Sequence, residues 1–131
     1  PGASLDVAGT MFMSGSLTVT GSMAVSGSVQ HNLRTVTGNY EVIDADYTIL
    51  VGGGGTKIIT LPSPSGSNIG RVINVRKLYN VGIVRVSSSA GYVEEYERVI
   101  WGAGGKGAGT FQSDGNVWWM IQGSGSWSLA N

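Results

Sequence analysis

Two groups of carboxylates are suited by type and spacing to acid–base chemistry. Glu94, Glu95 and Glu97 fall within four residues, and Asp44 and Asp46 are two residues apart. Two carboxylates can hydrolyse a glycosidic bond, and paired aspartates can contribute to a calcium site. Such a hydrolase needs a long groove built by a larger domain, and no recognisable loop of oxygen ligands accompanies the aspartates. We therefore expect the glutamates to form a solvated hairpin edge, where charge deters edge-to-edge pairing.

His31 is the only histidine of the sequence. If three copies of the chain met on a three-fold axis, three imidazoles could bind a transition metal. The alternative is an ordinary polar residue at the junction of two segments. A Ser-His-Asp triad would lack the Gly-x-Ser-x-Gly elbow between a strand and a helix. The sequence has no cysteine, which excludes disulfides and thiolate sites. We expect no catalysis and no cofactor.

The segment Gly102–Gly107 matches the Gly-x-Gly-x-x-Gly pattern of dinucleotide-binding loops. That chemistry requires a helix directly after the glycines and an acidic residue about 20 positions further on. The residues that follow are strand-like, and no acidic residue lies beyond Asp114. We expect a flexible loop.

Five aromatic side chains are candidates for contact surfaces: Tyr92, Tyr96, Trp101, Trp118 and Trp127. We expect them near loops or on the face opposite the core. Exposed rings can stack on sugars or anchor a protein partner. They can equally fill an interface between protomers, where aromatic residues are enriched, and we favour that role.

The composition narrows the classes of partner. The 131 residues carry 8 basic and 8 acidic side chains, so there is no basic field to attract nucleic acid or an anionic membrane. No apolar run approaches the roughly 20 residues that span a bilayer. Hydrophobic residues make up 41%, which is enough for a core, and 22 residues are glycine. The chain begins at Pro1 rather than Met, so we expect a piece of a longer polypeptide.

A six-residue repeat occupies the first part of the chain. Residues 9–32 form four hexads that each begin with glycine, and a related unit with one extra residue precedes them. The third and fifth positions are mostly apolar, which is the period of a strand, and glycine permits a corner. The pattern predicts a β-helical shaft with its core at these positions: Leu17, Val19, Met23 and Val25.

The number of hexads predicts the oligomeric state. With three faces to a coil, four hexads make only about one and a third coils, and solenoids need about three stacked repeats. Three chains would supply about four coils, so we expect a homotrimer with a three-fold axis. The alternative is a flexible Gly/Ser linker, but a linker has no reason to place apolar residues regularly.

From about residue 37 the pattern changes to longer strands separated by turn signals, with no convincing helix. We predict seven strands at 47–51, 57–61, 71–78, 83–87, 96–101, 109–113 and 116–122, with an Asp-Gly hairpin at 114–115 and another turn at 79–82. This predicts an all-β chain in which a shaft, residues 1–36, precedes a β-sandwich or jelly-roll-like head, residues 37–131. The expected core residues are Ile49, Val51, Ile59, Leu61, Ile73, Val75, Val84, Val86, Val99, Val117, Trp119 and Ile121.

A set of motifs runs through the second part of the chain: Asn39-Tyr-x-Val42, Asp46–Val51, Thr60-Leu-Pro62, Gly70-Arg71, Val75-Arg-Lys77 and Ser113-Asp-Gly-Asn116 followed by Trp118. Together these motifs resemble the small β heads at the ends of bacteriophage tail fibres and tailspikes. The match covers residues 37–122, and the preceding repeats resemble the triple β-helical shafts that carry such heads. The loops 52–55 and 102–109 and the tail 123–131 have no counterpart in the family.

The resemblance implies a non-enzymatic structural protein of the virion, on its extracellular side. The chain would form a homotrimer in which the head contacts a host-cell glycan or protein, or only caps and registers the trimer. It would insert into no membrane. A bacterial adhesin or lectin-like domain is the alternative. A hexapeptide acyltransferase fragment fits less well, because the coils are too few and residues 37–122 have β character.

Overall fold

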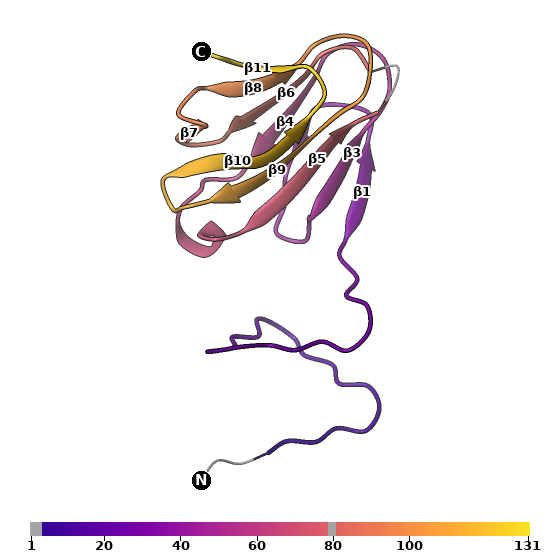
Figure 1. Cartoon of the computed structure of the whole chain (residues 1–131), viewed down its shortest axis with the longest axis vertical. Coiled ribbons are helices and arrows are strands. Elements are labelled where there is room, and N and C mark those ends of the chain that lie inside the picture. The colour runs from indigo at the N-terminus through magenta and orange to yellow at the C-terminus, as the bar shows by residue number, and fades with distance from the viewer. Residues whose placement is uncertain (1–3, 79–80) are drawn as a thin grey trace. The chain divides into compact units, whose positions relative to one another are not determined.

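The computed structural model describes residues 4–78 and 81–131, and the prediction of an all-β chain is confirmed for them (Figure 1). The chain divides into two compact units, Pro1–Gln30 and His31–Asn131. Residues 79 and 80 of the predicted turn, and the first residues of the unit that precedes the hexads, lie outside the described residues.

The second unit contains one 3-10 turn, Gly66–Asn68, and eleven strands among the described residues. The strands are β1 (Leu33–Val36), β2 (Tyr40–Glu41), β3 (Thr48–Val51), β4 (Lys57–Leu61), β5 (Val72–Lys77), β6 (Val84–Ser88), β7 (Tyr92–Val93), β8 (Arg98–Trp101), β9 (Gly107–Ser113), β10 (Val117–Ser124) and β11 (Trp127–Ala130). All seven strands predicted from the sequence are present, with shifts of a few residues at their ends. Strand β1 falls within the residues that we assigned to the shaft.

The strands form two facing sheets. Sheet A has the order β1-β3-β5-β9-β10-β7, and sheet B has the order β11-β8-β6-β4-β2. The first six strands alternate between the two sheets, and β1-β3-β5 and β2-β4-β6 pair in parallel. The chain thus makes three coils of a flattened solenoid, visible in Figure 1 as successive strands rising side by side. Jelly rolls are antiparallel, so the head departs from that type in this half.

The remaining strands close the sheets with antiparallel pairs. Strand β9 joins β5, β10 joins β9, β8 joins β6 and β11 joins β8. The predicted Asp-Gly hairpin is the β9–β10 turn, where Asp114 accepts hydrogen bonds from the amides of Asn116 and Val117 at 2.8 and 2.9 Å. The indole of Trp119 also donates to Asp114, at 2.7 Å, and this bond together with the two amides lowers the pKa of the carboxyl.

The core lies between the sheets, because strand alternation turns one face of each sheet inward. Nine of the twelve predicted core residues are buried there: Ile49, Val51, Ile59, Leu61, Ile73, Val75, Val84, Val86 and Val99. The other three predictions, all on β10, are wrong: Val117 and Trp119 are only partly buried and Ile121 is exposed. Trp118 faces the core instead, so the register of this strand is shifted by one residue, which exchanges its two faces.

Candidate functional site

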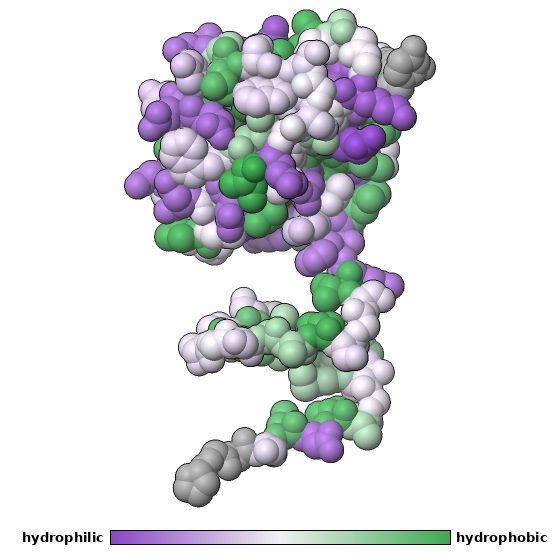
Figure 2. Space-filling view, viewed as in Figure 1, coloured by the Kyte–Doolittle hydropathy of each residue, from purple (hydrophilic) through white to green (hydrophobic). Residues whose placement is uncertain are grey.

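The hexad segment presents apolar side chains without a covering partner in the single chain. The four predicted shaft-core residues, Leu17, Val19, Met23 and Val25, are 45–65% exposed. Figure 2 shows green, hydrophobic atoms along the N-terminal segment. Among the described residues 4–30 there is no strand. The triple β-helix predicted for this segment is therefore not seen in one chain. Since each buried apolar side chain of this size contributes about 1.5–3 kcal/mol, the segment forgoes a large stabilisation when it is alone.

The six-residue period is nevertheless built into the backbone. Gly9, Gly15, Gly21 and Gly27 have φ values of 114°, 109°, 109° and 113°. Side chains with a Cβ rarely adopt such angles, so the glycines are required by conformation, and open space surrounds each of them. The chain turns in the same way at every sixth residue, as the predicted corners require.

The predicted contact aromatics divide into two groups. Tyr92, Tyr96 and Trp127 are 41–51% exposed and remain available for a partner. Trp101 and Trp118 lie at the loop ends of β8 and β10, as expected, but both are buried, so neither faces away from the core or is free for a contact surface. Trp101 comes two residues after the core residue Val99, and strand alternation alone could have placed it inward.

Trp101 reaches across the core from sheet B to sheet A. A Cβ at Gly107 would collide with the indole, and one at Gly109 would lie 2.8 Å from it, so both β9 glycines make room for the ring. The indole N–H of Trp101 donates to the carbonyl of Ser124 at 2.9 Å, and the ring meets Phe111 edge-on with 6.3 Å between centroids. The side chain is a structural link between the sheets.

Residues from the motifs that resemble tail-fibre heads contact one another. The indole N–H of Trp118 donates to the carbonyl of Pro62 at 2.8 Å, which joins the Asp-Gly hairpin to the Thr-Leu-Pro strand end. The amide of Gly70 donates to the carbonyl of Ser113 at 2.9 Å. These motifs therefore hold the head together, and their side chains are committed to the fold.

Asp46 is the centre of a buried polar cluster rather than a cation site. Its carboxylate accepts hydrogen bonds from Arg34 Nε at 2.7 Å, the Tyr40 hydroxyl at 2.6 Å and the Ile43 amide at 2.9 Å. Burial by itself would raise the pKa of Asp46, but the bonds from Tyr40, Arg34 and Ile43 together outweigh it and lower the pKa. The calcium candidate is thus satisfied by protein donors, and Asp44 beside it is exposed.

Arg71 fastens the same loop from the other side. Its guanidinium donates to the carbonyl of Ile43 at 2.6 Å and to that of Asp46 at 3.0 Å. Sequence reasoning missed this cluster, because Arg34 and Arg71 are 12 and 25 residues away from Asp46 along the chain. Arg71, in the motif Gly70-Arg71, was the available signal, whereas Arg34 lies outside the resemblance motifs.

His31 lies against the head. Its ring stacks on that of Tyr47, with 3.9 Å between centroids and 18° between planes. This contact fixes the imidazole at the start of the second unit. The three-fold metal site stays a prediction about an assembly of three chains.

The glutamates occupy a tight hairpin. Val93 and Tyr96 exchange two backbone hydrogen bonds of 2.8 Å, and Glu94 and Glu95 between them have φ values of 52° and 65°. Two positive φ angles define a type I′ turn, whose usual residues are Asn and Gly. The carboxylate of Glu94 accepts the amide of Met120 at 2.7 Å, so it serves the fold, while Glu95 is exposed.

The glycine motif 102–107 forms a loop before β9, not before a helix. The buried amine of Lys77 donates to the carbonyls of Gly104 and Gly105, at 3.2 and 2.6 Å. A phosphate site needs backbone N–H groups directed at the ligand, whereas this loop directs carbonyls at a cation. Carbonyl groups directed inward at a lysine fit the predicted loop and do not suit a phosphate.

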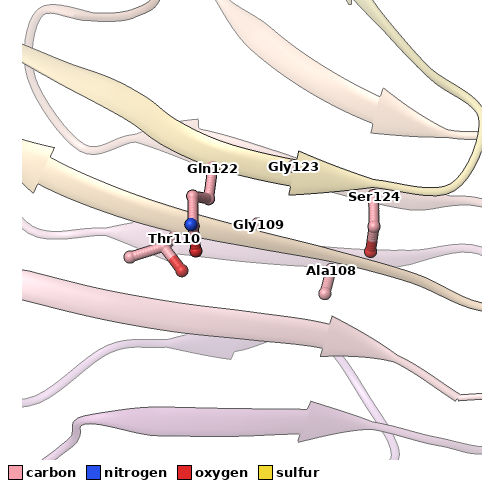
Figure 3. Close-up of a pocket in the computed structure, with 6 residues that line it drawn as sticks. All are labelled: Ala108, Gly109, Thr110, Gln122, Gly123 and Ser124. Atoms are coloured by element: carbon pink, nitrogen blue, oxygen red, sulfur yellow. The ribbon is translucent and has the colours of Figure 1, made fainter.

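A shallow groove of about 400 Å³ runs along the outer face of β9 and β10 (Figure 3). The small side chains of the two strands leave this space, and Thr110 and Gln122 face each other across the pair. The Thr110 hydroxyl already donates to Asn74 at 2.7 Å, and no charged side chain lines the groove. It can offer weak polar contacts only.

Comparison with known proteins assigns no family. No family model, no curated protein and no solved structure matches the chain. In the described part of the chain, no helix is long and apolar enough to cross a membrane. Within residues 4–78 and 81–131, no three His, Cys, Asp or Glu side chains gather in a way that could hold a metal ion.

Proposed function

We propose that the chain is a non-enzymatic structural component of a bacteriophage tail fibre or tailspike. In this proposal the repeat that precedes His31 trimerises as a shared β-helical shaft, and the head, which includes β1, attaches to the host surface or caps the trimer. The observation that carries it is the regular row of exposed apolar side chains between glycine corners, spaced by six residues. A single chain has nothing to cover this row, and a closed ring of three identical chains would cover it in each copy.

The head supports the proposal through its motifs. The residues that resemble fibre heads pack against one another in two sheets, as the contacts of Trp118 and Asp46 illustrate. A coiled two-sheet body with exposed Tyr92, Tyr96 and Trp127 leaves side chains free for a host ligand or for neighbouring protomers. The alternative, a bacterial adhesin or lectin-like domain, has the same arrangement of stalk and head and differs in being carried by a bacterial cell instead of a virion.

Solution mass tests the trimer directly. We expect light scattering on a sizing column to give three times the chain mass of 13.6 kDa, and an unboiled denaturing gel to retain a slow band. A clean monomer at tens of micromolar would overturn the proposal.

Paired variants test which face of the repeat assembles. Val19→Asp with Val25→Asp puts charges at the predicted shaft core, and burying a charge costs several kcal/mol, so we expect a monomer. Thr18→Asp with Ala24→Asp adds the same charge at the alternate phase and should keep the three-chain mass. If both pairs assemble alike, the apolar row is not the interface.

A further inference from the structure

Two arginines share one pocket on the outer face of sheet B, in the region of β6 and β8 in Figure 1. Arg98 lies opposite Ser87, and Arg85 lies opposite Ile100. The two arginines are thus diagonal neighbours on adjacent strands, and both point away from the core because Val86 and Val99 point into it. The pocket has a volume of about 310 Å³.

The charge in this pocket is unbalanced. Glu97 is the only acidic side chain that lines it, and its carboxylate meets Arg98 at a long 3.4 Å while remaining largely exposed. Within the described residues, Nε of Arg85 and Nε of Arg98 are buried and have no hydrogen-bond partner. These Nε–H groups lack an acceptor and are closed to solvent, so a ligand in the pocket would meet the terminal N–H groups of the two guanidiniums, and those of Arg98 make only the long bond to Glu97.

The other lining residues suit a saccharide rather than a bare ion. Ser87 contributes a hydroxyl group and Ile58 an apolar edge, whereas the Ser88 hydroxyl already donates to the carbonyls of Pro62 and Ala90. Guanidinium groups bind carboxylates and phosphates through parallel N–H donors, which gives geometric selectivity as well as charge. The volume is at the lower end of small-molecule sites and fits about one sugar ring.

We propose that this pocket binds the carboxylate or phosphate group of an acidic saccharide, with Arg85 and Arg98 as the anion donors. Ser87 would hydrogen-bond a ring hydroxyl, and Ile58 would lie against the apolar face of the ring. The inference rests on the proposed function only in taking a surface polysaccharide of the host as the source of the sugar. The groove on β9 and β10 lacks any charged lining residue and is not part of the site.

The Nε–H resonances of the two arginines give a direct readout. We would titrate the full chain, labelled with ¹⁵N, with glucuronic acid, glucose 6-phosphate, glucose and inorganic phosphate. Saturable shifts at Arg85 and Arg98 with both acidic sugars, and none with glucose, are expected. Inorganic phosphate should bind more weakly than glucose 6-phosphate; equal affinity would reduce the site to a simple anion site and overturn the saccharide assignment.

Four variants separate charge from folding. Arg85→Gln or Arg98→Gln should weaken the acidic sugars by about tenfold or more, since each removes a charged hydrogen bond. Arg76→Gln removes an exposed arginine of sheet A and should leave the affinity within twofold. Glu97→Gln removes the competing carboxylate and should tighten binding by about two- to fivefold, a gain that misfolding cannot produce.

The same samples distinguish the two proposals. A three-chain mass without any arginine shift at tens of millimolar acidic sugar would overturn the pocket and leave the trimeric shaft standing. A monomer that still binds acidic sugars through Arg85 and Arg98 would overturn the shaft and leave the pocket standing.

Discussion

At the scale of single residues, the head depends on a few polar side chains that join segments far apart in sequence. Asp46 is the best example, because its carboxylate connects strand β1 through Arg34, strand β2 through Tyr40 and its own loop through Ile43. The guanidinium of Arg34 also lies over the Tyr40 ring, 5.4 Å from its centroid. Each partner therefore holds another in place.

Asp46→Asn should destabilise the head by about 2 kcal/mol at pH 7, because the amide loses the charge and presents a donor to donors. The pKa of Asp46 is lower in the folded protein than in the unfolded chain. Its stabilisation is therefore complete above the unfolded pKa, near 4, and is lost as the pH falls through the lower folded value. Urea unfolding at a series of pH values should show the difference between variant and wild type shrinking below about pH 4.

Asp44→Asn is the control for this experiment. Its carboxylate is exposed, and the substitution should change stability by less than about 0.5 kcal/mol at any pH. A difference between Asp46→Asn and wild type that stays constant down to pH 2 would show that shape, rather than ionisation, explains the loss.

At the scale of elements, the turn between Val93 and Tyr96 is under conformational strain. Glutamate at positive φ costs about 1–2 kcal/mol relative to glycine, and this turn has two such residues in succession. Glu95→Gly should raise the melting temperature by a few degrees, because the relief of strain exceeds the entropy that glycine loses on folding. Differential scanning calorimetry measures the change.

A glutamate-to-glycine substitution at a position without a positive φ should change the melting temperature in the opposite direction. Glu41→Gly, in the short strand β2 and without a positive φ, is expected to lower the melting temperature, since glycine weakens a strand. If Glu95→Gly also lowers it, the Glu95 side chain makes a stabilising contact that outweighs the strain.

Elements could be predicted where alternation was clear and not where it was ambiguous. Five of the predicted strands, β3, β4, β5, β6 and β8, place apolar residues at alternate positions, and the nine correctly predicted core residues followed from that pattern. Strands β2 and β7 have two residues each, too few for any period, and β11 follows a Gly-Ser run that indicates a tail. In β10 both phases of Val117–Ile121 are apolar, so periodicity could not choose the inward face, and a bulge after Met120 adds a further shift.

The pairing of strands was also outside the reach of local pattern. Half-buried strands of parallel coils and of antiparallel sandwiches share a period of two, and the connections between β1 and β6, three to ten residues long, are shorter than the crossovers that usually join parallel strands. Similarly, the two arginines of the pocket lie on β6 and β8 and become neighbours only through the register of these strands. The cluster around Asp46 also depends on residues that are distant in sequence. Only the fold brings these groups together.

At the scale of the whole molecule, the two units have different sources of stability. The second unit has its own buried core, with residues such as Phe111 and Ile73 fully inaccessible to solvent. The first unit has glycine corners and exposed apolar side chains, and in our proposal it would bury them against other copies of the chain. We therefore expect the repeat to be required for assembly, and we expect the head to fold without the repeat.

A fragment that begins at His31 tests this division. We expect residues 31–131 to fold on their own, with the far-UV circular dichroism spectrum of a β protein. The fragment should have the mass of one chain, and its melting temperature should be independent of protein concentration. The full chain should have the mass of three chains and a melting transition that rises with concentration, because association stabilises the folded state by mass action. Were the fragment itself trimeric, the exposed aromatics Tyr92, Tyr96 and Trp127 would be the interface, and the repeat would extend a trimer that the head had already formed.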